Sequence, residues 1–526
     1  MSLSTLNATA ATLSKNRTED SVVSISGMCA TCVDGCIGMC EIGKSAYRGT
    51  EAIYPQPYGI ITSAGQKTYP VDLSHFNILG SCRGAHGVEL DPDKAIFPKV
   101  NLEQKIGHDK GIKFKLPFVI PGLGSTAVAS NNWEGLAVGA ALSGISLTIG
   151  ENVCGMDSNS KIKNGKIIHS PDMERRVKLF KEWQENGYGT IAVQANVEDT
   201  RLGVQEYVIE KLGVDVVELK WGQGAKDIGG EVKIKDLKRA QMLKERGYMV
   251  IPDPCDKNVI KAFEHHAFHE FERHSRIGMV DIESFCKRVE ELRKAGAKYV
   301  FLKTGAYRPS DLALAVRCCS EAKIDLLTVD GAGGGTGMSP WRMMCEWGIP
   351  GVELWSLLYQ YINKFAKKGM HIPDVAIAGG LTLEDQIFKG LALGAPFFKL
   401  IGMARSPLAA AMVGKNICSR VEEGFLPVYV ARFGKSIEEI FITAPELKRK
   451  YGKDFEKIPP GAIGLYTYMK RLEQGVKQLM CGARKFALEY IKRDDIVALT
   501  HSASEISGIK YIMECDKQEA EKILGD

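Results

Sequence analysis

Eight short apolar runs, separated by amphipathic segments, follow one another through the middle of this 526-residue chain. Strands that alternate with helices predict a parallel sheet, and eight of them predict an α/β fold closed into a (β/α)8 TIM barrel. An open doubly wound sheet is the structural alternative. The expected strands are residues 117–121, 144–149, 190–195, 216–220, 299–303, 326–329, 375–378 and 397–401. A ninth run, 249–252, is placed in a long excursion between the fourth and fifth strands.

The regions around the expected barrel differ from it in composition. Residues 1–20 are polar and rich in Ser, Thr and Asn, which predicts a disordered tail. Residues 21–115 contain a cysteine cluster and an irregular approach segment, and residues 116–432 form the barrel. Residues 433–526 predict a C-terminal helical extension, in which 465–491 is an amphipathic covering helix.

Overall composition narrows the classes of function. Hydrophobic residues make up 45% of the chain and charged residues 25%, as in an ordinary water-soluble protein with a large core. The net charge of +5, without a dense basic stripe, argues against a nucleic-acid partner. The sequence shows neither a long charge-free apolar run nor a secretory pattern, so we expect a cytoplasmic protein without a membrane partner.

A cysteine cluster near the start of the chain predicts a metal centre. Fourteen cysteines in a chain without a secretory pattern indicate reduced thiols or metal ligands. The cluster has the spacing Cys-x2-Cys-x3-Cys-x3-Cys, one residue from a bacterial ferredoxin run. An iron–sulfur cluster of 4Fe–4S type is favoured, zinc or plain structural cysteines are alternatives, and Cys82 could replace one ligand. The candidate ligands are Cys29, Cys32, Cys36 and Cys40.

The sixth expected strand ends at an acidic residue and a glycine cluster. Barrel enzymes build their sites where strands end at the carboxyl face, and glycine lets the backbone approach a ligand closely. This junction predicts an active-site loop, with a flexible loop that binds nothing as the alternative. Its candidate cofactor-binding residues are Asp330, Gly333, Gly334 and Thr336.

The junctions after the seventh and eighth expected strands predict a phosphate site. Barrels often bind phosphate with these two loops and a helix N-terminus, whose N–H groups and dipole favour an anion. An arginine in the second loop can add a bidentate contact. Two ordinary glycine turns are the alternative. The candidate residues are Gly379, Gly380, Gly402, Met403 and Arg405.

The fourth junction carries two lysines and a glutamine on a glycine-rich loop. Lys220, Gln223 and Lys226 would face the barrel mouth, where they could bind a dicarboxylate or polarise a carbonyl. Glu151, after the second strand, points to the same mouth. Lys303 lies on an otherwise apolar strand and suits the electron-rich edge of a reduced flavin. Exposed surface lysines are the alternative reading.

Four histidines are concentrated in residues 263–274. His265 and His269 would share one face of a helix and could then bind a metal. Because no acid–base partner pattern accompanies them, a polar lid segment is favoured.

Three motifs resemble the FMN-binding synthase domain of glutamate synthases, and the match covers about residues 116–432. The motifs are Lys220-x-x-Gln223-Gly224-Ala225-Lys226, Asp330-Gly331-x-Gly333-Gly334-x-Thr336-Gly337-x-Ser339-Pro340 and Gly379-Gly380-Leu381. The resemblance implies a barrel that binds FMN and reduces 2-iminoglutarate, made from 2-oxoglutarate and ammonia, to L-glutamate. Implied FMN contacts are Gly122, Ser125, Gln194, Lys303, Gly334, Gly379, Gly380, Gly402 and Met403. Implied substrate-facing residues are Glu151, Lys220, Gln223 and Lys226.

The sequence departs from the family pattern at several places. No nucleophilic cysteine of a glutaminase domain follows Met1, so we expect ammonia from solution, from another subunit or from another donor. The family's β-helical C-terminal domain is also not recognised. Of the family's three cluster cysteines after the last strand, residues 411–432 keep only Cys418, so the N-terminal cysteines are the expected electron entry. Trp221 and Asp227-Ile228 alter the fourth-junction motif.

Three functions are consistent with these patterns. The favoured one is an FMN-dependent oxidoreductase of glutamate synthase type acting on CH–NH2 donors, with electrons entering through the iron–sulfur cluster. A transferase subunit similar to methylamine–glutamate N-methyltransferase is the second. The third is a non-catalytic flavin and iron–sulfur electron relay, which predicts a barrel mouth plugged by large side chains. Expected partners are a 2-oxo acid or amino acid, a ferredoxin or reductase subunit, an ammonia-supplying subunit and further copies of the chain.

Overall fold

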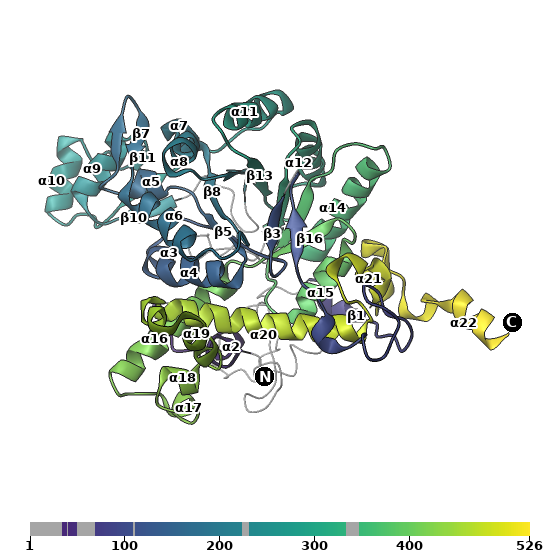
Figure 1. Ribbon diagram of the computed structural model, residues 1–526. Helices are drawn as coiled ribbons and strands as arrows, with labels where there is room; N and C mark the ends of the chain where they lie inside the picture. The colour runs from purple at the N-terminus through teal and green to yellow at the C-terminus, as the bar shows by residue number, and fades with distance from the viewer. Residues whose placement is uncertain are drawn as a thin grey trace, which may run out of the picture.

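Eight parallel strands close into a barrel in a computed structural model that describes residues 34–38, 40–49, 69–108, 111–222, 231–332 and 347–525 (Figure 1). Neighbours around the barrel follow chain order, and the last strand pairs with the first. The TIM-barrel prediction is confirmed and the open doubly wound sheet is wrong. The strands are β4 (Phe118–Leu123), β5 (Ser146–Ile149), β8 (Ile191–Ala195), β9 (Val216–Lys220), β13 (Tyr299–Thr304), β14 (Leu326–Asp330), β15 (Asp374–Ala378) and β16 (Phe398–Gly402).

Helices cover the outside of the barrel, one principal helix after each strand. Every residue of β5, β8 and β14 is buried, because one face of each strand meets the barrel interior and the other meets helices. This double burial explains why the strands are continuous apolar runs in the sequence. The principal helices are α4 (Trp133–Ser143), α6 (Pro171–Trp183), α8 (Val204–Leu212), α11 (Ile282–Lys294), α12 (Pro309–Glu321), α14 (Gly351–Ala366), α15 (Glu384–Leu393) and α16 (Arg405–Glu422).

A hairpin from the approach segment closes the amino end of the barrel. Its strands, β2 (Gln104–Ile106) and β3 (Ile112–Phe114), are antiparallel. Ile106, Ile112 and Phe114 form one apolar cluster with residues from seven of the eight barrel strands. Those residues are Val119, Ala192, Val216, Phe301, Leu326, Ala376 and Leu400. The hairpin is therefore the floor of the barrel, and the carboxyl ends of the strands are left for a site.

The excursion between β9 and β13 folds as a small subdomain with its own sheet. Its strands are antiparallel in the order β10-β12-β11, with helices α9 (Leu237–Glu245) and α10 (Lys257–Glu264) beside them. They are β10 (Glu231–Ile234), β11 (Met249–Ile251) and β12 (Phe271–His274), so the expected ninth strand lies in the excursion as predicted.

The histidine segment of this excursion is not one helix. The helix α10 ends at Glu264, and the backbone of His266 has a φ of 58°. The shared helical face of His265 and His269, on which the metal-site alternative depended, is therefore absent. Among the residues that the structure describes, no group of three or more His, Cys, Asp or Glu side chains could hold a metal ion.

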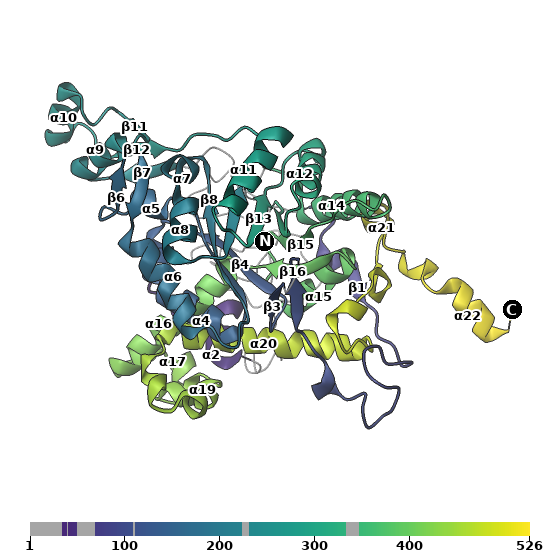
Figure 2. The ribbon, with the colours of Figure 1, turned by 45° about the horizontal axis from the view of Figure 1, so that its top comes forward.

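A long C-terminal helix, α20 (Pro460–Gly482), crosses α4, α15 and α16 on the outside of the barrel (Figures 1 and 2). Glycines let the helices approach: a Cβ on Gly414 of α16 would lie 2.9 Å from the Cα of Gly464. The covering helix expected at 465–491 is confirmed, but its bounds are wrong. It begins earlier, where Pro460 suits a first helical turn, and it ends before Arg484, whose φ is 59°.

The remaining elements lie in the two ends of the chain or in short insertions between barrel strands and helices. The N-terminal helix α2 (Glu41–Arg48) packs against α16 and α20, and β1 (Phe76–Ile78) pairs antiparallel with β17 (Ile496–Ala498). No helix among the described residues is long and apolar enough to cross a bilayer. The shorter elements are α3 (Ala127–Asn131), α5 (Val153–Met156), β6 (Lys161–Lys163), β7 (Lys166–His169), α7 (Val197–Leu202), α17 (Val428–Ala431), α18 (Ile437–Ile440), α19 (Ala444–Tyr451), α21 (His501–Ser507) and α22 (Lys517–Leu524).

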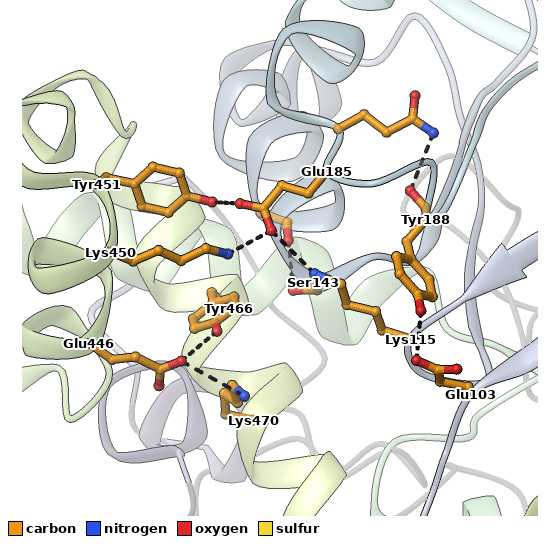
Figure 3. A network of polar contacts seen from close by, with 12 residues as sticks. Glu103, Lys115, Ser143, Glu185, Tyr188, Glu446, Lys450, Tyr451, Tyr466 and Lys470 are labelled. Carbon is orange, nitrogen blue, oxygen red and sulfur yellow. Dashed lines mark hydrogen bonds and ion pairs between the residues drawn. The ribbon is translucent and has the colours of Figure 1, made fainter.

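A network of polar contacts ties α19 to the amino end of the barrel (Figure 3). The Glu185 carboxylate, in the loop between α6 and β8, accepts hydrogen bonds from Tyr451 Oη and from Lys450 Nζ at 2.6 Å. Lys115 Nζ, just before β4, lies 3.3 Å from the same carboxylate. One acidic side chain therefore joins the C-terminal extension to the barrel.

Candidate functional site

Two predicted side chains form an ion pair at the carboxyl end of the barrel. Lys220 is the last residue of β9, and Glu151 follows β5. Lys220 Nζ lies 2.6 Å from Glu151 Oε1. Burial alone would raise the pKa of Glu151. The positive charge and hydrogen bond of Lys220, together with the charge of Lys303, outweigh burial and bring the pKa below its usual value. Strands two places apart around the barrel thus bring an anionic and a cationic group to the same mouth.

A second ion pair lies deeper in the same end. Lys303 Nζ of β13 is 3.2 Å from Asp330 Oδ2 at the end of β14, and both residues are buried. Burial lowers the pKa of Lys303, but Asp330 and Glu218 raise it, and the balance lies above the usual value. Lys303 and Lys220 are direct partners in the β13–β9 register. Two cations therefore stand side by side on neighbouring strands.

The sequence prediction missed one interior acid, Glu218 of β9. Glu218 faces Gln194 in the register of β8 with β9, and Gln194 Nε2 donates a hydrogen bond to Glu218 Oε1. Burial raises the pKa of Glu218, while the charge of Lys303 acts in the opposite direction. A signal was present in the sequence: Glu218 precedes Lys220 by two residues, so both point to the same face of the strand.

The predicted cofactor residue Gln194 has an unsatisfied atom. Its Oε1 is buried and has no hydrogen-bond partner in the described part of the chain. A Cβ built on Gly122 would lie 2.7 Å from this oxygen, so the absence of a side chain at Gly122 leaves room for the amide. A buried acceptor without a partner costs about 1–3 kcal/mol, which a ligand that donates a hydrogen bond would recover.

The predicted phosphate residues lie together after β15 and β16. Gly379 and Gly380 have φ values of 122° and 90°, which favour glycine. A Cβ on Gly379 would lie 2.8 Å from Gly331 N, and a Cβ on Gly402 would lie 2.8 Å from Ala378 Cβ, so larger residues would collide. Such a cradle fits a phosphate-bearing cofactor.

The helix α16 begins beside this cradle. Its first residue, Arg405, follows β16 closely, and the N-cap residue Ala404 makes no side-chain hydrogen bond to the first turn. Met403 is buried, and its N–H donates to Val119 O at 3.0 Å, which fixes the start of the loop on β4. Backbone N–H groups at a helix start favour an anion, as the phosphate prediction requires.

The loop after β4 is held against the loop that carries Glu151. A Cβ on Gly124 would lie 2.4 Å from Glu151 O, and Gly150 N donates to Leu123 O at 2.9 Å. Arg176 of α6, also missed in the sequence, donates from Nη1 to Gly124 O at 3.1 Å. Ser125, a predicted flavin contact, lies half-buried in this loop.

Part of the predicted site lies outside the described residues. This part comprises Gln223, Lys226, Gly333, Gly334, Thr336, Cys29 and Cys32. Their predicted roles stay predictions.

The other two predicted metal ligands, Cys36 and Cys40, lie at the start of α2. Gly38 N donates to Cys36 Sγ and Gly43 N to Cys40 Sγ, both at 3.4 Å. Asn416 of α16 donates from Nδ2 to Cys36 O at 2.5 Å, so this segment is docked on α16.

Comparison with known proteins was made with both sequence and structure. Residues 272–419 match the family model described as the conserved region in glutamate synthase. The archaeal-type glutamate synthase [NADPH] of Dehalococcoides mccartyi is 26% identical over 340 residues, which cover 63% of this chain and 56% of that protein. The chain therefore spans little more than half the length of this curated relative.

Comparison with solved structures also found similar folds. A flavocytochrome b2 mutant with pyruvate bound has 13% sequence identity and a TM-score of 0.45, with 81% of this chain and 76% of that chain covered. A mandelate oxidase mutant with the monooxide FMN adduct has 13% identity and a TM-score of 0.44, with 80% and 87% covered.

Proposed function

We propose that this chain, whose residues 272–419 match the glutamate synthase family model, is an FMN-dependent oxidoreductase. It would reduce the imine that 2-oxoglutarate forms with ammonia and so produce L-glutamate. The observation that carries the proposal is the charged mouth of the barrel. There the two lysines of the Lys220–Glu151 and Lys303–Asp330 pairs stand on neighbouring strands. Among the described residues, four charged side chains gather at this end, which supports an enzyme over an electron relay.

The described residues fit FMN at two places. Gly379, Gly380, Gly402 and the start of α16 would hold the phosphate, because a tight glycine backbone and a helix N-terminus suit an anion. Gln194 and Lys303 would contact the ring, through an unsatisfied oxygen and a buried cation. When bound, FMN supplies hydride transfer to and from carbon, and the protein supplies position and charge.

The substrate side is assigned to Glu151 and Lys220, with Gln223 and Lys226 from the sequence motif. Reduction of an imine adds a hydride to its carbon and a proton to its nitrogen. Glu151 Oε1 holds Lys220 Nζ at 2.6 Å, so that the lysine ammonium group lies at the mouth. There it could pair with a substrate carboxylate or donate this proton. Lys303 is fixed deeper by Asp330 and stays with the cofactor.

Electron entry is assigned to the N-terminal cysteines, Cys29, Cys32, Cys36 and Cys40, as ligands of an iron–sulfur cluster. Backbone N–H groups at Cys36 and Cys40 Sγ are of the kind that tune cluster thiolates, which supports this assignment. The cysteine segment and α2 are docked on α16, the helix whose start belongs to the proposed phosphate site. The domain division at residues 20, 115 and 432, a ferredoxin or reductase partner, an ammonia-supplying subunit, self-association and a cytoplasmic location belong to the same proposal.

The first test is the cofactor itself. Anaerobically purified protein should release FMN on acid treatment, identified by chromatography, and should contain iron and sulfide. FAD as the main flavin, or one zinc per chain without iron, would contradict the corresponding assignment. Reduced protein should then be reoxidised by 2-oxoglutarate with ammonium.

The second test separates substrate use from flavin binding. Lys220→Met should slow this reoxidation by about 30-fold to 1000-fold, because a fixed charge at a reacting centre contributes about 2–4 kcal/mol. Its FMN content should remain that of the wild type. The matched control is Lys298→Met, since Lys298 pairs with Asp215 at 2.9 Å at the opposite end of the barrel and should leave the rate unchanged.

Two results would overturn parts of this proposal. Reoxidation of Lys220→Met at the wild-type rate would remove Lys220 from the substrate site. Wild-type protein that binds FMN but is reoxidised by no 2-oxo acid would replace the synthase function by the transferase or the electron relay.

A further inference from the structure

The pair formed by Gln194 and Glu218 is almost completely shielded from solvent. Gln194 is 1% exposed and Glu218 is 3% exposed, and they face each other on β8 and β9. Gln194 Nε2 donates its hydrogen bond to Glu218 Oε1. Because both side chains are shielded from water, their hydrogen bond to each other fixes the position of each.

The contact also fixes which end of the amide points away from Glu218. An ionised carboxylate only accepts hydrogen bonds, whereas an amide has a donor end and an acceptor end. Burial raises the pKa of Glu218 above its usual value, although the charge of Lys303, the hydrogen bond from Gln194 and the charge of Lys220 act in the opposite direction. In the structure the NH2 group of Gln194 donates to Glu218 Oε1, and the amide oxygen is turned toward Gly122.

The oxygen of Gln194 is left as a buried acceptor. It has no partner in the described part of the chain, and Gly122 allows its close approach at the end of β4. Gly122 and Gln194 are both implied flavin contacts. An acceptor in this place selects for a ligand group that donates, because an acceptor opposite it would leave both atoms unsatisfied.

We propose that Glu218 is a positioning residue that orients Gln194 so that the cofactor site accepts a hydrogen bond from the ring N–H of the flavin. The inference rests on the proposed function, since it concerns the same FMN site. The oxidised isoalloxazine ring has one N–H, at N3, between two carbonyl groups. The orientation of one amide therefore decides whether the protein binds N3–H or a neighbouring carbonyl.

The test compares FMN with FMN methylated at N3, which lacks this donor. Apoprotein should bind FMN about 10-fold to 100-fold more tightly than the methylated form, because the methylated ring leaves Gln194 Oε1 unsatisfied. In Glu218→Gln the facing side chain is itself an amide, which accepts or donates, so Gln194 is free to turn. The preference for FMN should then fall to about threefold or less.

A matched control is Glu206→Gln. Glu206 lies on α8, outside the barrel, and pairs with Arg288. This variant removes a comparable charge from a neighbouring element and should keep the wild-type preference. A loss of preference common to both variants would show a general loosening of the fold and would overturn the positioning role.

The outcomes separate this inference from the proposed function. Equal binding of the two flavins by wild type, or an undiminished preference in Glu218→Gln, overturns the inference alone. The second result would mean that Gln194 is oriented without Glu218, or that the methyl group acts by its size. Protein that binds neither flavin overturns the proposed function as well. Should Glu218→Gln fail to fold, Gln194→Met decides, since removal of the acceptor should abolish the hydrogen-bond part of the preference.

Discussion

The two ends of the barrel differ in how they satisfy buried polar groups. At the amino end, Asp325 accepts a hydrogen bond from Val300 N at 2.9 Å, and Asp374 accepts one from Gly107 N at 2.8 Å. Both acids accept hydrogen bonds from backbone donors, and Asp325 is also paired with the half-exposed His108. The β2–β3 hairpin fills the interior between the strands with apolar side chains, so this end stabilises the fold by apolar burial and satisfied hydrogen bonds.

At the carboxyl end, side chains face one another instead. Lys303 pairs with Asp330, Glu218 holds Gln194, and the oxygen of Gln194 has no partner within the described residues. Burial of charges and of an unsatisfied acceptor opposes folding, so this end keeps its polar groups at a cost to stability. The comparison indicates that the floor stabilises the barrel and that the mouth is arranged for a ligand.

The largest expected effect is on the floor. Phe114→Ala should lower the free energy of unfolding by about 3–5 kcal/mol, because Phe114 is completely buried in the floor cluster and its removal leaves a cavity. Denaturant unfolding measures this loss. The affinity for FMN, measured on the folded fraction, should stay unchanged, since the floor lies at the other end of the strands.

The matched control is Leu90→Ala, in the same approach segment. Leu90 is 78% exposed, so its removal should change the free energy of unfolding by less than about 0.5 kcal/mol. A Phe114→Ala protein of full stability that had lost FMN would contradict the division into floor and mouth.

The floor is the part of the fold that the sequence did not predict. The eight barrel strands were predictable because burial on both faces makes each an apolar run. The strands β2 and β3 have three residues each, and only their pairing and their contacts with seven other strands give them a role. Such long-range contacts leave no local pattern, so the segment was read as an irregular approach.

The same limit applies to the mouth. Lys220, Glu151 and Lys303 were predictable as polar residues at strand ends, where barrels build their sites. Glu218 was missed because a single acid within an apolar strand has no evident partner until the register places Gln194 beside it. Arg176 was missed for a similar reason, since it acts from the helix behind the loop.

A smaller effect should appear at the mouth as a dependence of stability on pH. Asp199 is buried behind Glu151 and accepts a hydrogen bond from Asn152 N at 2.9 Å; burial raises its pKa to about 7. Because this folded-state pKa lies above the usual 3.8, the contribution of Asp199 to stability is complete below pH 3.8 and is lost progressively as pH rises from there through about 7.

Between pH 6 and pH 8, wild type should therefore lose about 1 kcal/mol more of its free energy of unfolding than Asp199→Asn. Urea unfolding at the two pH values measures the difference. Asp93→Asn, at an exposed loop position, should keep the wild-type dependence. Identical pH profiles of wild type and Asp199→Asn would show that the buried carboxyl does not titrate in this range.

The smallest expected effect on stability concerns the network that joins α19 to the amino end of the barrel (Figure 3). Burial raises the pKa of Glu185, but hydrogen bonds from Lys450 and Tyr451 and the charges of Lys450 and Lys115 lower it below the usual 4.5. Its contribution to stability is therefore present above pH 4.5 and is lost as pH falls through the lower, folded-state pKa. Glu185→Gln should cost about 0.5 kcal/mol at pH 7, and less once the pH falls below the folded-state pKa of Glu185.

The effect on stability is small because this network is partly exposed and water screens its ion pairs. The ion pairs of the mouth are more deeply buried. Glu182→Gln is the matched control. Glu182 lies on α6 near Glu185, is 51% exposed and pairs along its own helix with Lys178 at 3.5 Å, so thermal unfolding should change little. FMN affinity should be unaltered in both variants. A drop of FMN affinity in Glu185→Gln alone would mean that the anchoring of α19 reaches the mouth through the barrel, and the two ends would then have to be treated as one coupled unit.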